Sequence, residues 1–573
     1  MEFLQTLTDW EIFGIVFSVI FVAWYIHDKY VQREHQLLVN YPIIGRLRFL
    51  LEEVREPFRQ YFGDEKFYES KDKLDWVYKA SKDLPNYASF SPSQPLPQPK
   101  FMIKHSNRVL NDDEVSDNFE VIFGENREKP YVCKTIIARS AMSDGSISPE
   151  GTRAFVRGAY MGHFPINSGE GGVTSNFFTT HENYKEEYMT IVHGNSFQKA
   201  IKKFFDIFFN SAVSMRVYRK LVFGNNPEAE TYMLDVKNRV FYRPNWDAPL
   251  EAFPSEVPQD MPDIIFQISS GLYGARDKTG KFDPLRYQKV MKFCQMTEIK
   301  LAQGAKQTGG KLAAAKVTSA IAYYRNVEAH KDVFSPNRFP FANSIEELFD
   351  FIGELQQISQ KPVGIKIVIS SKDNIEPYAK EIKRRIDLGM TSSYPDYIAL
   401  DSGSGGSATA PLETMERVGL STLDAVYLVD KVLKDYDIRD KIKISASGKV
   451  LTPDDMLIVL ALGADFIQIA RGFMMSAGCI RARYCSGTTG HQCPVGLATQ
   501  DKSKRQKYFV HKQASKVKNY HKNLLKSLKG LLAIMGLKSV NELKKEQLFF
   551  VDKDLKVYEN IDVVFEDILN LKN

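Results

Sequence analysis

The chain has 573 residues, of which 43% are hydrophobic and 25% charged, a balance typical of folded globular proteins and unlike that of disordered or fibrous ones. Its 76 basic and 70 acidic residues are interspersed, which argues against an obligate nucleic-acid binder, because such proteins concentrate basic residues on one face. Five cysteines are too few for a disulfide scaffold. At roughly 100–250 residues per domain, the length allows several domains or one large barrel with additions.

The first predicted element is an uncharged run over residues 12–26, with Trp10 and Trp24 near its two ends. Extended to Trp10, it reaches the lower length limit of a membrane-spanning helix, about 17 residues. It lacks the basic start and the small-residue cleavage site of a signal peptide. Because Lys29 follows the run and no basic residue precedes it, the positive-inside rule places the remaining chain in the cytoplasm. We expect residues 1–30 to be a single-pass anchor in the inner (cytoplasmic) membrane, with a buried or interfacial helix as the alternative.

Residues 31–130 are predicted to form an N-terminal arm, first helical and then extended. Apolar residues recur there at helical spacing, at Leu47, Leu50, Leu51, Val54 and Phe58. Pro57 should end or kink this helix. Residues 63–130 are polar and irregular, with four prolines between positions 92 and 99, so we expect them to wrap around a larger domain.

From residue 131 to residue 515, short apolar runs rich in β-branched residues alternate with helix-like segments. The predicted strands are residues 135–138, 264–268, 298–301, 364–369, 397–400, 441–445 and 465–469. Such alternation implies a parallel sheet with helical crossovers. A strand number approaching eight favours an α/β fold of the (β/α)8 TIM barrel type, with a doubly wound sheet as the alternative. Residues 516–573 are predicted to be a C-terminal helical extension whose leucine stripe serves in packing.

The segments that follow these strands are rich in glycine and serine. They are residues 138–148, 166–172, 302–311, 401–411, 446–450 and 470–472. Glycines let backbone N–H groups approach an anion, and barrel enzymes carry their sites on the loops after the strands. Six such loops in series predict a phosphorylated cofactor. No G-x-G-x-x-G sequence opens a strand–helix unit, so no nicotinamide dinucleotide domain is expected.

Three of the five cysteines are clustered near the end of the predicted barrel, at Cys479, Cys485 and Cys493. Their spacing is C-x5-C-x7-C, and a proline follows the third. Such clustering in a chain that faces the cytoplasm favours metal or iron–sulfur ligation. A three-iron cluster and a zinc ion with His491 as fourth ligand both remain open. Cys133 and Cys294 lie in strand-like or helical text, where we expect buried small side chains.

Several of these segments, in this order, carry a resemblance to a known family. Between Ser140 and Gln500 the chain reads AMSDGSIS, NSGEGG, IKLAQGAK, GSGGSATAPL, GADFIQIARG and CPVGLATQ. This order resembles the synthase domain of glutamate synthase, which is an FMN-dependent barrel. The apolar N-terminus and the helix after it resemble a membrane-anchored, single-chain bacterial subgroup that lacks the glutaminase domain.

The resemblance implies FMN at the mouth of the barrel and a three-iron four-sulfide cluster nearby. It implies reduction of a 2-imino acid, formed from 2-oxoglutarate plus ammonia or an amine, to an amino acid. The partners that it implies are this small 2-oxo or imino acid, an external electron donor that is ferredoxin-like or membrane-associated, and the membrane itself. Homo-oligomers are compatible with it, and nucleic acid is not expected.

The family's functional residues can be carried over where its motifs match. The isoalloxazine ring would lie on Ala141, Met142 and Ser143, and the FMN phosphate on Gly405, Gly406, Ser407, Gly448 and Gly472. Lys300 would lie near the flavin N1/O2 edge, where a fixed cation favours the reduced anion. Gln303 and Lys306 would face the substrate, and the three clustered cysteines would bind the iron. Glu170 is a further catalytic candidate, with loop stabilisation as its alternative role.

The chain departs from the family at three places that bear on function, one of which is the loop after IKLAQGAK, where it is one residue shorter and lacks the family's proline. The family's cysteine spacing is C-x5-C-x4-C, so either the three extra residues here loop out or the cluster is absent. The segment SPNRFPF has Arg338 where the family usually carries histidine, and we expect this arginine to bind a substrate carboxylate. The alternative functions are another flavin-dependent 2-hydroxy or amino acid oxidoreductase, or a catalytically degenerate membrane-bound scaffold or electron-transfer subunit.

Overall fold

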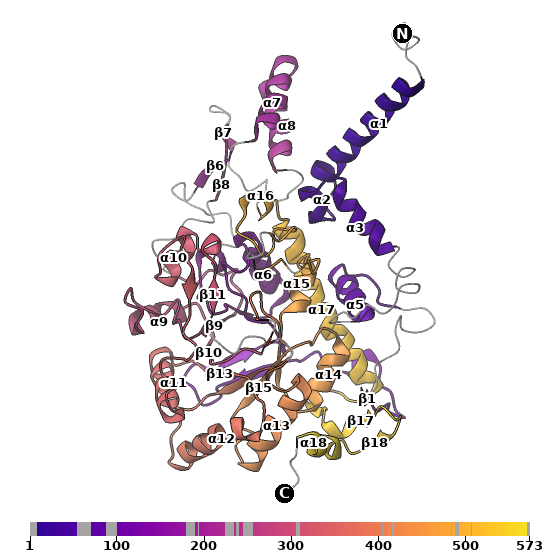
Figure 1. Ribbon diagram of the computed structural model, residues 1–573. Helices are drawn as coiled ribbons and strands as arrows, with labels where there is room; N and C mark the ends of the chain where they lie inside the picture. Colours follow the sequence, from indigo (N-terminus) through magenta and orange to yellow (C-terminus); the bar gives the residue numbers. More distant parts are fainter. Residues whose placement is uncertain are drawn as a thin grey trace.

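A closed barrel of eight parallel strands forms the centre of the computed structural model (Figure 1). The structure describes residues 9–53, 70–87, 100–178, 189–192, 194–223, 234–235, 240–244, 256–304, 310–403, 405–411, 413–414, 417–482, 484–486, 492–505 and 507–569. The barrel strands are β4 (Ile137–Arg139), β5 (Ile166–Asn167), β9 (Ile264–Ile268), β10 (Met296–Lys300), β13 (Val363–Ile367), β14 (Tyr397–Asp401), β15 (Lys443–Ser447) and β16 (Phe466–Ile469). They follow one another in chain order, and β16 pairs with β4 to close the ring, which confirms the TIM barrel and excludes the doubly wound sheet.

All seven predicted strands are present, and each of their ends lies within two residues of its predicted position. They could be recognised because strands buried on both faces are nearly continuous apolar runs. The eighth strand, β5, was not predicted. It has only two residues, one paired with β4 and two with β9, and so short a segment carries no periodicity.

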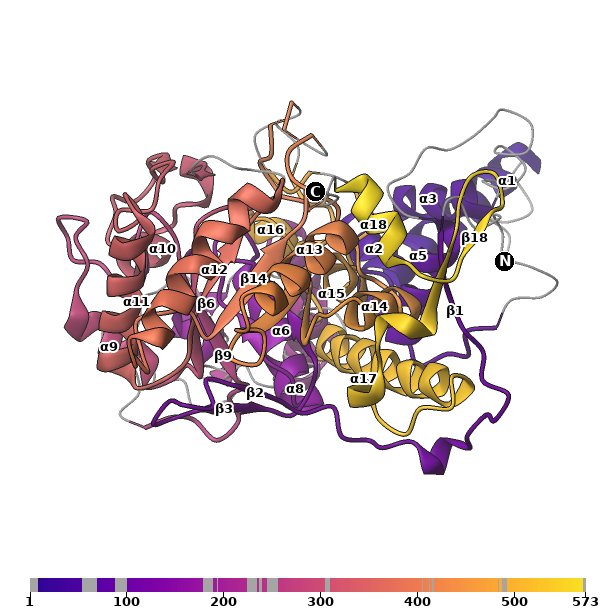
Figure 2. The same cartoon turned by 90° about the horizontal axis from the view of Figure 1, so that it is seen from below.

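Helices surround the strands. They are α6 (Pro149–Gly162), α9 (Pro284–Met291), α11 (Ile345–Ser359), α12 (Lys372–Asp387), α13 (Thr422–Asp435), α14 (Pro453–Ala461) and α15 (Arg471–Ser476). Figure 2 shows α9, α11, α12, α13 and α14 following one another around one side. The long helix α17 (Val510–Ile534) packs on α6 and α14, so the predicted C-terminal extension begins inside the helical coat of the barrel. Leu524, Leu528 and Leu532 have no exposed surface, which confirms the predicted packing of the leucine stripe.

The N-terminal arm contains more regular structure than the sequence indicated. Helix α5 (Lys71–Ser81) is capped by the Ser70 hydroxyl, buries Leu74 and Val77, and packs on α17. Strand β1 (Lys100–Ile103) pairs with β17 (Leu548–Val551), which pairs with β18 (Val557–Tyr558). Strands β2 (Val121–Phe123) and β3 (Tyr131–Cys133) form a hairpin, and α18 (Asp562–Ile568) ends the described chain. The described parts of the arm thus contain helix and strand, and they pack on the C-terminal elements α17 and β17.

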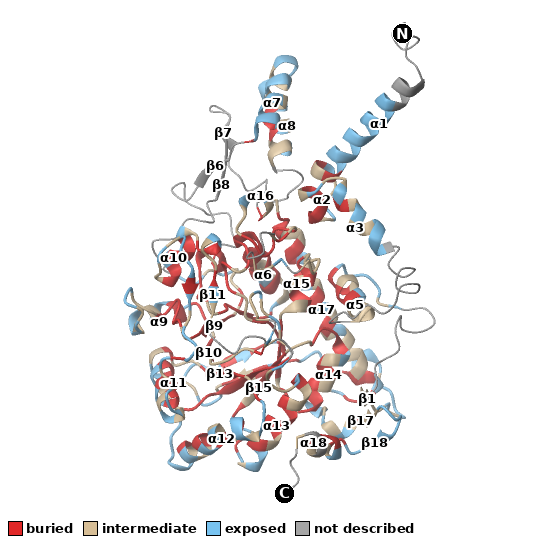
Figure 3. Ribbon diagram, viewed as in Figure 1, coloured by how far each residue is buried: buried red, intermediate tan, exposed pale blue. Residues whose placement is uncertain are grey.

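Helix α1 (Asp9–Ile26) extends away from the barrel, and its described side chains are exposed (Figures 1 and 3). Within the described residues, one helical stretch, Gly14–Val31, is long and apolar enough to cross a membrane, a criterion that signal sequences also meet. A π-helical turn, η2 (His27–Val31), follows it, and then α2 (Gln36–Asn40) and α3 (Ile44–Glu53). The buried Asp28 carboxylate accepts hydrogen bonds from Arg46, which joins the base of α1 to α3. The predicted end of this helix at Pro57 lies outside the described residues.

Two insertions interrupt the alternation of strands and helices, and neither was located in advance. After β5 come β6 (Met189–Val192), α7 (Ser196–Phe208), α8 (Ser211–Phe223), β7 (Leu234–Asp235) and β8 (Val240–Pro244). After β10 come β11 (Lys311–Leu312), α10 (Ser319–Arg325) and β12 (Val333–Phe334). The short helix α16 (Lys502–Arg505) precedes α17. Helices α7 and α8 project from the same end of the molecule as α1 (Figure 1).

Candidate active site at the mouth of the barrel

The interior of the barrel holds a buried carboxylate that is fully hydrogen-bonded. Glu298 on β10 has no exposed surface and accepts hydrogen bonds from the side-chain amides of Asn167 (2.8 Å), Gln267 (2.6 Å) and Gln468 (2.8 Å). The four residues come from β5, β9, β10 and β16, so the network joins half of the strands. Because a buried charge is tolerated only with such partners, the network gives the floor of the site one fixed geometry.

Two lysines lie side by side above this floor. Lys300 and Lys366 are paired in register on β10 and β13. The Lys300 Nζ is 2.8 Å from the Glu170 carboxylate, and the Lys366 Nζ is 3.2 Å from the Asp401 carboxylate. Burial alone would lower the pKa of Lys366, but the carboxylates of Asp401 and Glu298 outweigh it and raise this pKa above its ordinary value. The carboxyl ends of two adjacent strands therefore carry two cations.

The loop expected to contact the flavin ring is locked to the loop after β5. The Ser143 hydroxyl accepts a hydrogen bond of 3.0 Å from the backbone N–H of Gly171. Gly169 has φ +70°, and a Cβ there would lie 2.6 Å from the Ser143 backbone nitrogen, so only glycine fits. Ala141 and Met142, which precede Ser143, remain partly exposed at the rim.

A buried arginine holds this loop from below. The Arg139 guanidinium donates hydrogen bonds to the carbonyl oxygens of Ser140 (3.0 Å) and Met142 (3.1 Å) and lies over the Phe155 ring. Burial lowers its pKa to about 9. Arg139 therefore fixes the backbone that presents the predicted flavin contacts.

The loops after the last three barrel strands converge, as a phosphate site requires. Gly448 has φ +125°, and a Cβ there would lie 2.0 Å from the Ser402 hydroxyl oxygen. Its carbonyl accepts a hydrogen bond of 2.8 Å from the Thr422 hydroxyl. A Cβ on Gly406 would lie 3.2 Å from the Arg471 guanidinium, so this cation faces the loop after β14. The result is a cradle of exposed backbone with an arginine beside it.

The remaining carried-over residues have more varied positions. The Gln303 side chain donates a 3.2 Å hydrogen bond to the Gly406 carbonyl and so connects the loops after β10 and β14. Gly405 and Ser407 are partly exposed beside it. Gly472 faces α17 instead, because a Cβ there would lie 2.0 Å from the Tyr520 hydroxyl oxygen. Close packing of α15 on α17 is thus sufficient reason for a glycine at this position.

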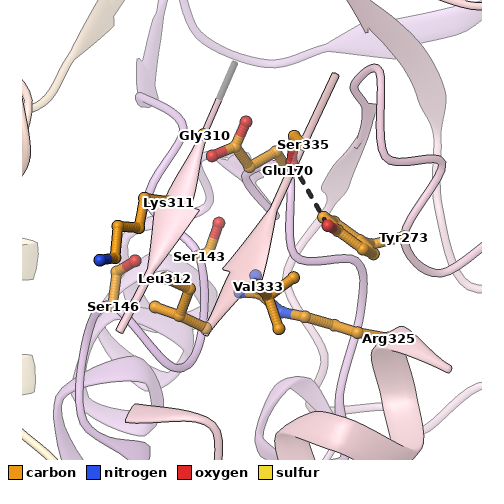
Figure 4. A pocket seen from close by; sticks show the side chains of 10 residues that line it. All are labelled: Ser143, Ser146, Glu170, Tyr273, Gly310, Lys311, Leu312, Arg325, Val333 and Ser335. Carbon is orange, nitrogen blue, oxygen red and sulfur yellow. Dashed lines mark hydrogen bonds between the residues drawn. The ribbon is translucent and has the colours of Figure 1, made fainter. Parts of the chain in front are cut away.

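A small cleft opens beside Lys300 and contains an arginine that the sequence did not single out (Figure 4). It is lined by Ser143, Ser146, Glu170, Tyr273, Gly310, Lys311, Leu312, Arg325, Val333 and Ser335. The Arg325 guanidinium is buried, donates to the Asp144 carbonyl oxygen (3.1 Å) and lies 5.3 Å from the centre of the Tyr273 ring. Its Nε has no hydrogen-bond partner among the described residues. A buried guanidinium with an unused donor is suited to an anion.

Of the three predicted substrate residues, Gln303 and Arg338 do not line this cleft. Arg338 is exposed and is not one of the lining residues. Lys306 lies in the segment 305–309, outside the described residues. Arg325, from α10, is the arginine that the structure brings next to Glu170.

The three clustered cysteines come near one another below the second insertion. Burial, followed by the neighbouring Cys485 and Cys493, raises the pKa of the Cys479 thiol to about 12. The Lys316 ammonium donates a 2.6 Å hydrogen bond to the Cys485 carbonyl oxygen. Within the described ranges, no three Cys, His, Asp or Glu side chains are placed so that they could hold one metal ion. His491 lies outside those ranges. Cys133 and Cys294 are buried, as predicted for small side chains within strands or helices.

Comparison with known proteins identifies the family. A family model described as the conserved region in glutamate synthase matches residues 84–538. The glutamate synthase large subunit-like protein YerD of Bacillus subtilis (strain 168) is 30% identical, and the match covers 96% of each chain. The chain belongs to the glutamate synthase family. This confirms the predicted enzyme class, an FMN-dependent oxidoreductase of glutamate synthase type.

More distant members of the glutamate synthase family match about half of this chain. The archaeal-type glutamate synthase (NADPH) of Thermotoga maritima is 29% identical over 53% of this chain and 56% of its own length. The chain thus spans about half of such relatives. Among solved structures, a double variant of flavocytochrome b2 with sulfite bound is 11% identical, with a TM-score of 0.40 over 93% of this chain and 94% of the other.

Proposed function

We propose that this glutamate synthase-type chain reduces 2-iminoglutarate, formed from 2-oxoglutarate and ammonia, to glutamate in the cleft beside Lys300. The overall reaction consumes 2-oxoglutarate, ammonia, two electrons and two protons, and yields glutamate and water. When bound, FMN supplies the two electrons, delivered as hydride from its reduced form. The observation that carries the proposal is the placement of Lys300, Lys366 and Arg325 together at the mouth of a barrel of this family.

The residues present fit FMN. The backbone cradle at Gly448 would be filled by any Cβ, which is the property expected of a backbone that approaches a phosphate. Arg471 faces the same loops and can pair with the phosphate. Ala141 and Met142, held by Arg139, offer the ring contacts. Lys366 and Lys300 supply the fixed positive charge that favours a reduced, anionic ring.

Arg325 is the proposed anchor for a substrate carboxylate. Its planar fork suits bidentate binding, Arg325 lines the cleft, and its Nε has no hydrogen-bond partner among the described residues. The Lys300–Glu170 pair lies in the same region and can hold or deliver a proton to the substrate nitrogen. The exposed position of Arg338 favours Arg325 over it for this role.

Anaerobic reoxidation of the reduced protein tests the reaction. The full chain, reduced photochemically without oxygen, should regain its oxidised flavin spectrum when 2-oxoglutarate and ammonium are added together, and glutamate should appear in equal amount. Neither compound alone should have this effect. Reoxidation by 2-oxoglutarate alone with formation of a 2-hydroxy acid would favour a different flavin oxidoreductase, and a colourless protein would favour a scaffold.

A three-iron four-sulfide cluster on Cys479, Cys485 and Cys493 is the second part of the proposal. Thiolates are the ligands that such clusters use, but the present spacing of the side chains does not hold a metal, so we assign no reaction step to it. The variant Cys485→Ala should lose bound iron and retain FMN. The matched control Cys294→Ala, at a buried cysteine outside the group, should retain both. Iron analysis and visible spectra of the two variants decide this, and unchanged iron in Cys485→Ala would remove the assignment.

The cellular setting completes the proposal. We infer that α1 crosses the inner membrane once and leaves the barrel in the cytoplasm, where a ferredoxin-like or membrane-associated donor supplies electrons. The apolar, exposed surface of α1 supports the span, and Lys29 after it supports the orientation. The full chain should therefore stay in the membrane pellet after alkaline carbonate washing, whereas release into the supernatant would contradict a spanning helix. A homo-oligomer is compatible with this arrangement.

A further inference from the structure

The hairpin of α7 and α8 exposes large apolar side chains far from the barrel. They are Phe197, Phe204, Ile207, Phe208 and Phe209, each half exposed or more and Ile207 71% exposed. Soluble proteins seldom leave such a group on one short element, since each fully exposed side chain forgoes about 1.5–3 kcal/mol of burial. Three of the five follow one another at 207–209, where the hairpin turns. The turn is therefore the most apolar part of the hairpin.

The same hairpin is strongly basic. Residues 196–223 contain six lysines and arginines and one acidic residue, Asp206, which pairs with Lys202 (2.6 Å). Lys199 and Lys203 are exposed on α7, and Arg216 and Lys220 are exposed on α8. Aromatic side chains combined with surrounding cations are typical of helices that lie in the interface of an anionic membrane.

The base of the hairpin is attached to the base of α1. The Gln198 side chain is buried, lies near the Tyr30 side chain in η2 and donates a hydrogen bond to the Leu221 carbonyl oxygen (2.7 Å). The hairpin is stiffened by its own small core of Met215 and Tyr218. Figures 1 and 3 show α1 and the hairpin projecting from the same end of the molecule, both largely exposed. A membrane that contains α1 is therefore within reach of the hairpin.

We propose that the α7–α8 hairpin is a second membrane-binding element, which inserts its turn, with Phe208 and Phe209, into the anionic leaflet at the base of α1. Its lysines and arginines bind lipid phosphates. The inference depends on the proposed span of α1. Two contacts with one membrane fix the orientation of the barrel more firmly than a single anchoring helix does. The hairpin leaves the barrel after β5, at the end that carries the candidate site.

Photo-crosslinking of the full chain to lipid tests the hairpin and the anchor separately. The photoreactive residue p-benzoyl-phenylalanine replaces Phe208, Phe17 on α1, or Leu388, a 65% exposed residue just after α12 at the opposite end. Each protein is reconstituted in phosphatidylcholine vesicles that contain phosphatidylglycerol and a fluorescent lipid. Irradiation should give lipid adducts at 17 and 208, with yields at least about tenfold above that at 388.

The outcomes distinguish the two proposals. If lipid adducts form at position 17 but the yield at position 208 is no greater than that at position 388, the membrane-binding role of the hairpin is refuted and the anchor proposal stands. Adducts at neither position would overturn the anchor as well. In vesicles without phosphatidylglycerol, the yield at 208 should fall at least about threefold and the yield at 17 should stay constant, because only the hairpin depends on the basic residues. Equal adduct yields at position 208 with and without phosphatidylglycerol would refute the binding of the hairpin to anionic lipid.

Discussion

Replacing Arg325 with leucine is expected to raise KM for 2-oxoglutarate about 100-fold while FMN stays bound. Two charge-assisted hydrogen bonds between a guanidinium and a carboxylate contribute about 1.5 kcal/mol each or more, and the loss of about 3 kcal/mol corresponds to this factor. Arg325 is buried in the cleft beside Glu170, so solvent cannot replace the lost interaction. Steady-state kinetics with 2-oxoglutarate varied at saturating ammonium measure the effect.

Two further variants make this result specific. Arg325→Lys keeps the charge but loses the fork, so KM should rise by a smaller factor, about tenfold. Arg338→Leu removes an exposed guanidinium outside the cleft and should leave KM within twofold of the unmodified chain. If KM rises in Arg338→Leu and stays constant in Arg325→Leu, the assignment made from the sequence is right and the one made from the structure is wrong.

Arg325 also shows why part of the site could not be predicted from the sequence. It lies on α10, inside an insertion, and only the fold of that insertion brings it to the cleft. Glu298 and its amide donors illustrate the same limit, since Asn167, Gln267 and Gln468 come together only when the barrel closes. Pairings between distant strands leave no local pattern, whereas the glycine-rich loops lie within single segments and were recognisable.

Lys366 is a different case, because its signal was present. It interrupts the apolar run GIKIVI just as Lys300 ends the run MTEIK, and an ionisable side chain in a buried strand demands an explanation. Lys300 lies in the family motif IKLAQGAK, whereas Lys366 lies in none of the matching motifs, so the resemblance pointed to Lys300 alone. The α7–α8 insertion was missed for the opposite reason. Its basic and aromatic residues do not form the buried stripe by which core helices are recognised.

The variant Lys366→Met is expected to lower the rate of flavin reoxidation by 2-oxoglutarate and ammonium about 100- to 1000-fold. This is the usual effect of removing one positive group from a place where charge changes during the reaction. The raised pKa of Lys366 means that it is charged throughout the neutral range, so the loss should be the same from pH 6 to pH 9. Stopped-flow absorbance of the anaerobically reduced protein measures the rate.

Removing Lys366 also leaves the Asp401 carboxylate buried without its cation, which by itself destabilises the fold. The double variant Lys366→Met, Asp401→Asn removes both charges and should recover thermal stability without recovering the reoxidation rate. Stability and rate that recover together would mean that the pair acts only in folding. If Lys366→Met binds FMN and its reoxidation rate stays within twofold of that of the unmodified chain, Lys300 alone is the functional cation. The Lys300→Met variant should then show the whole loss of rate.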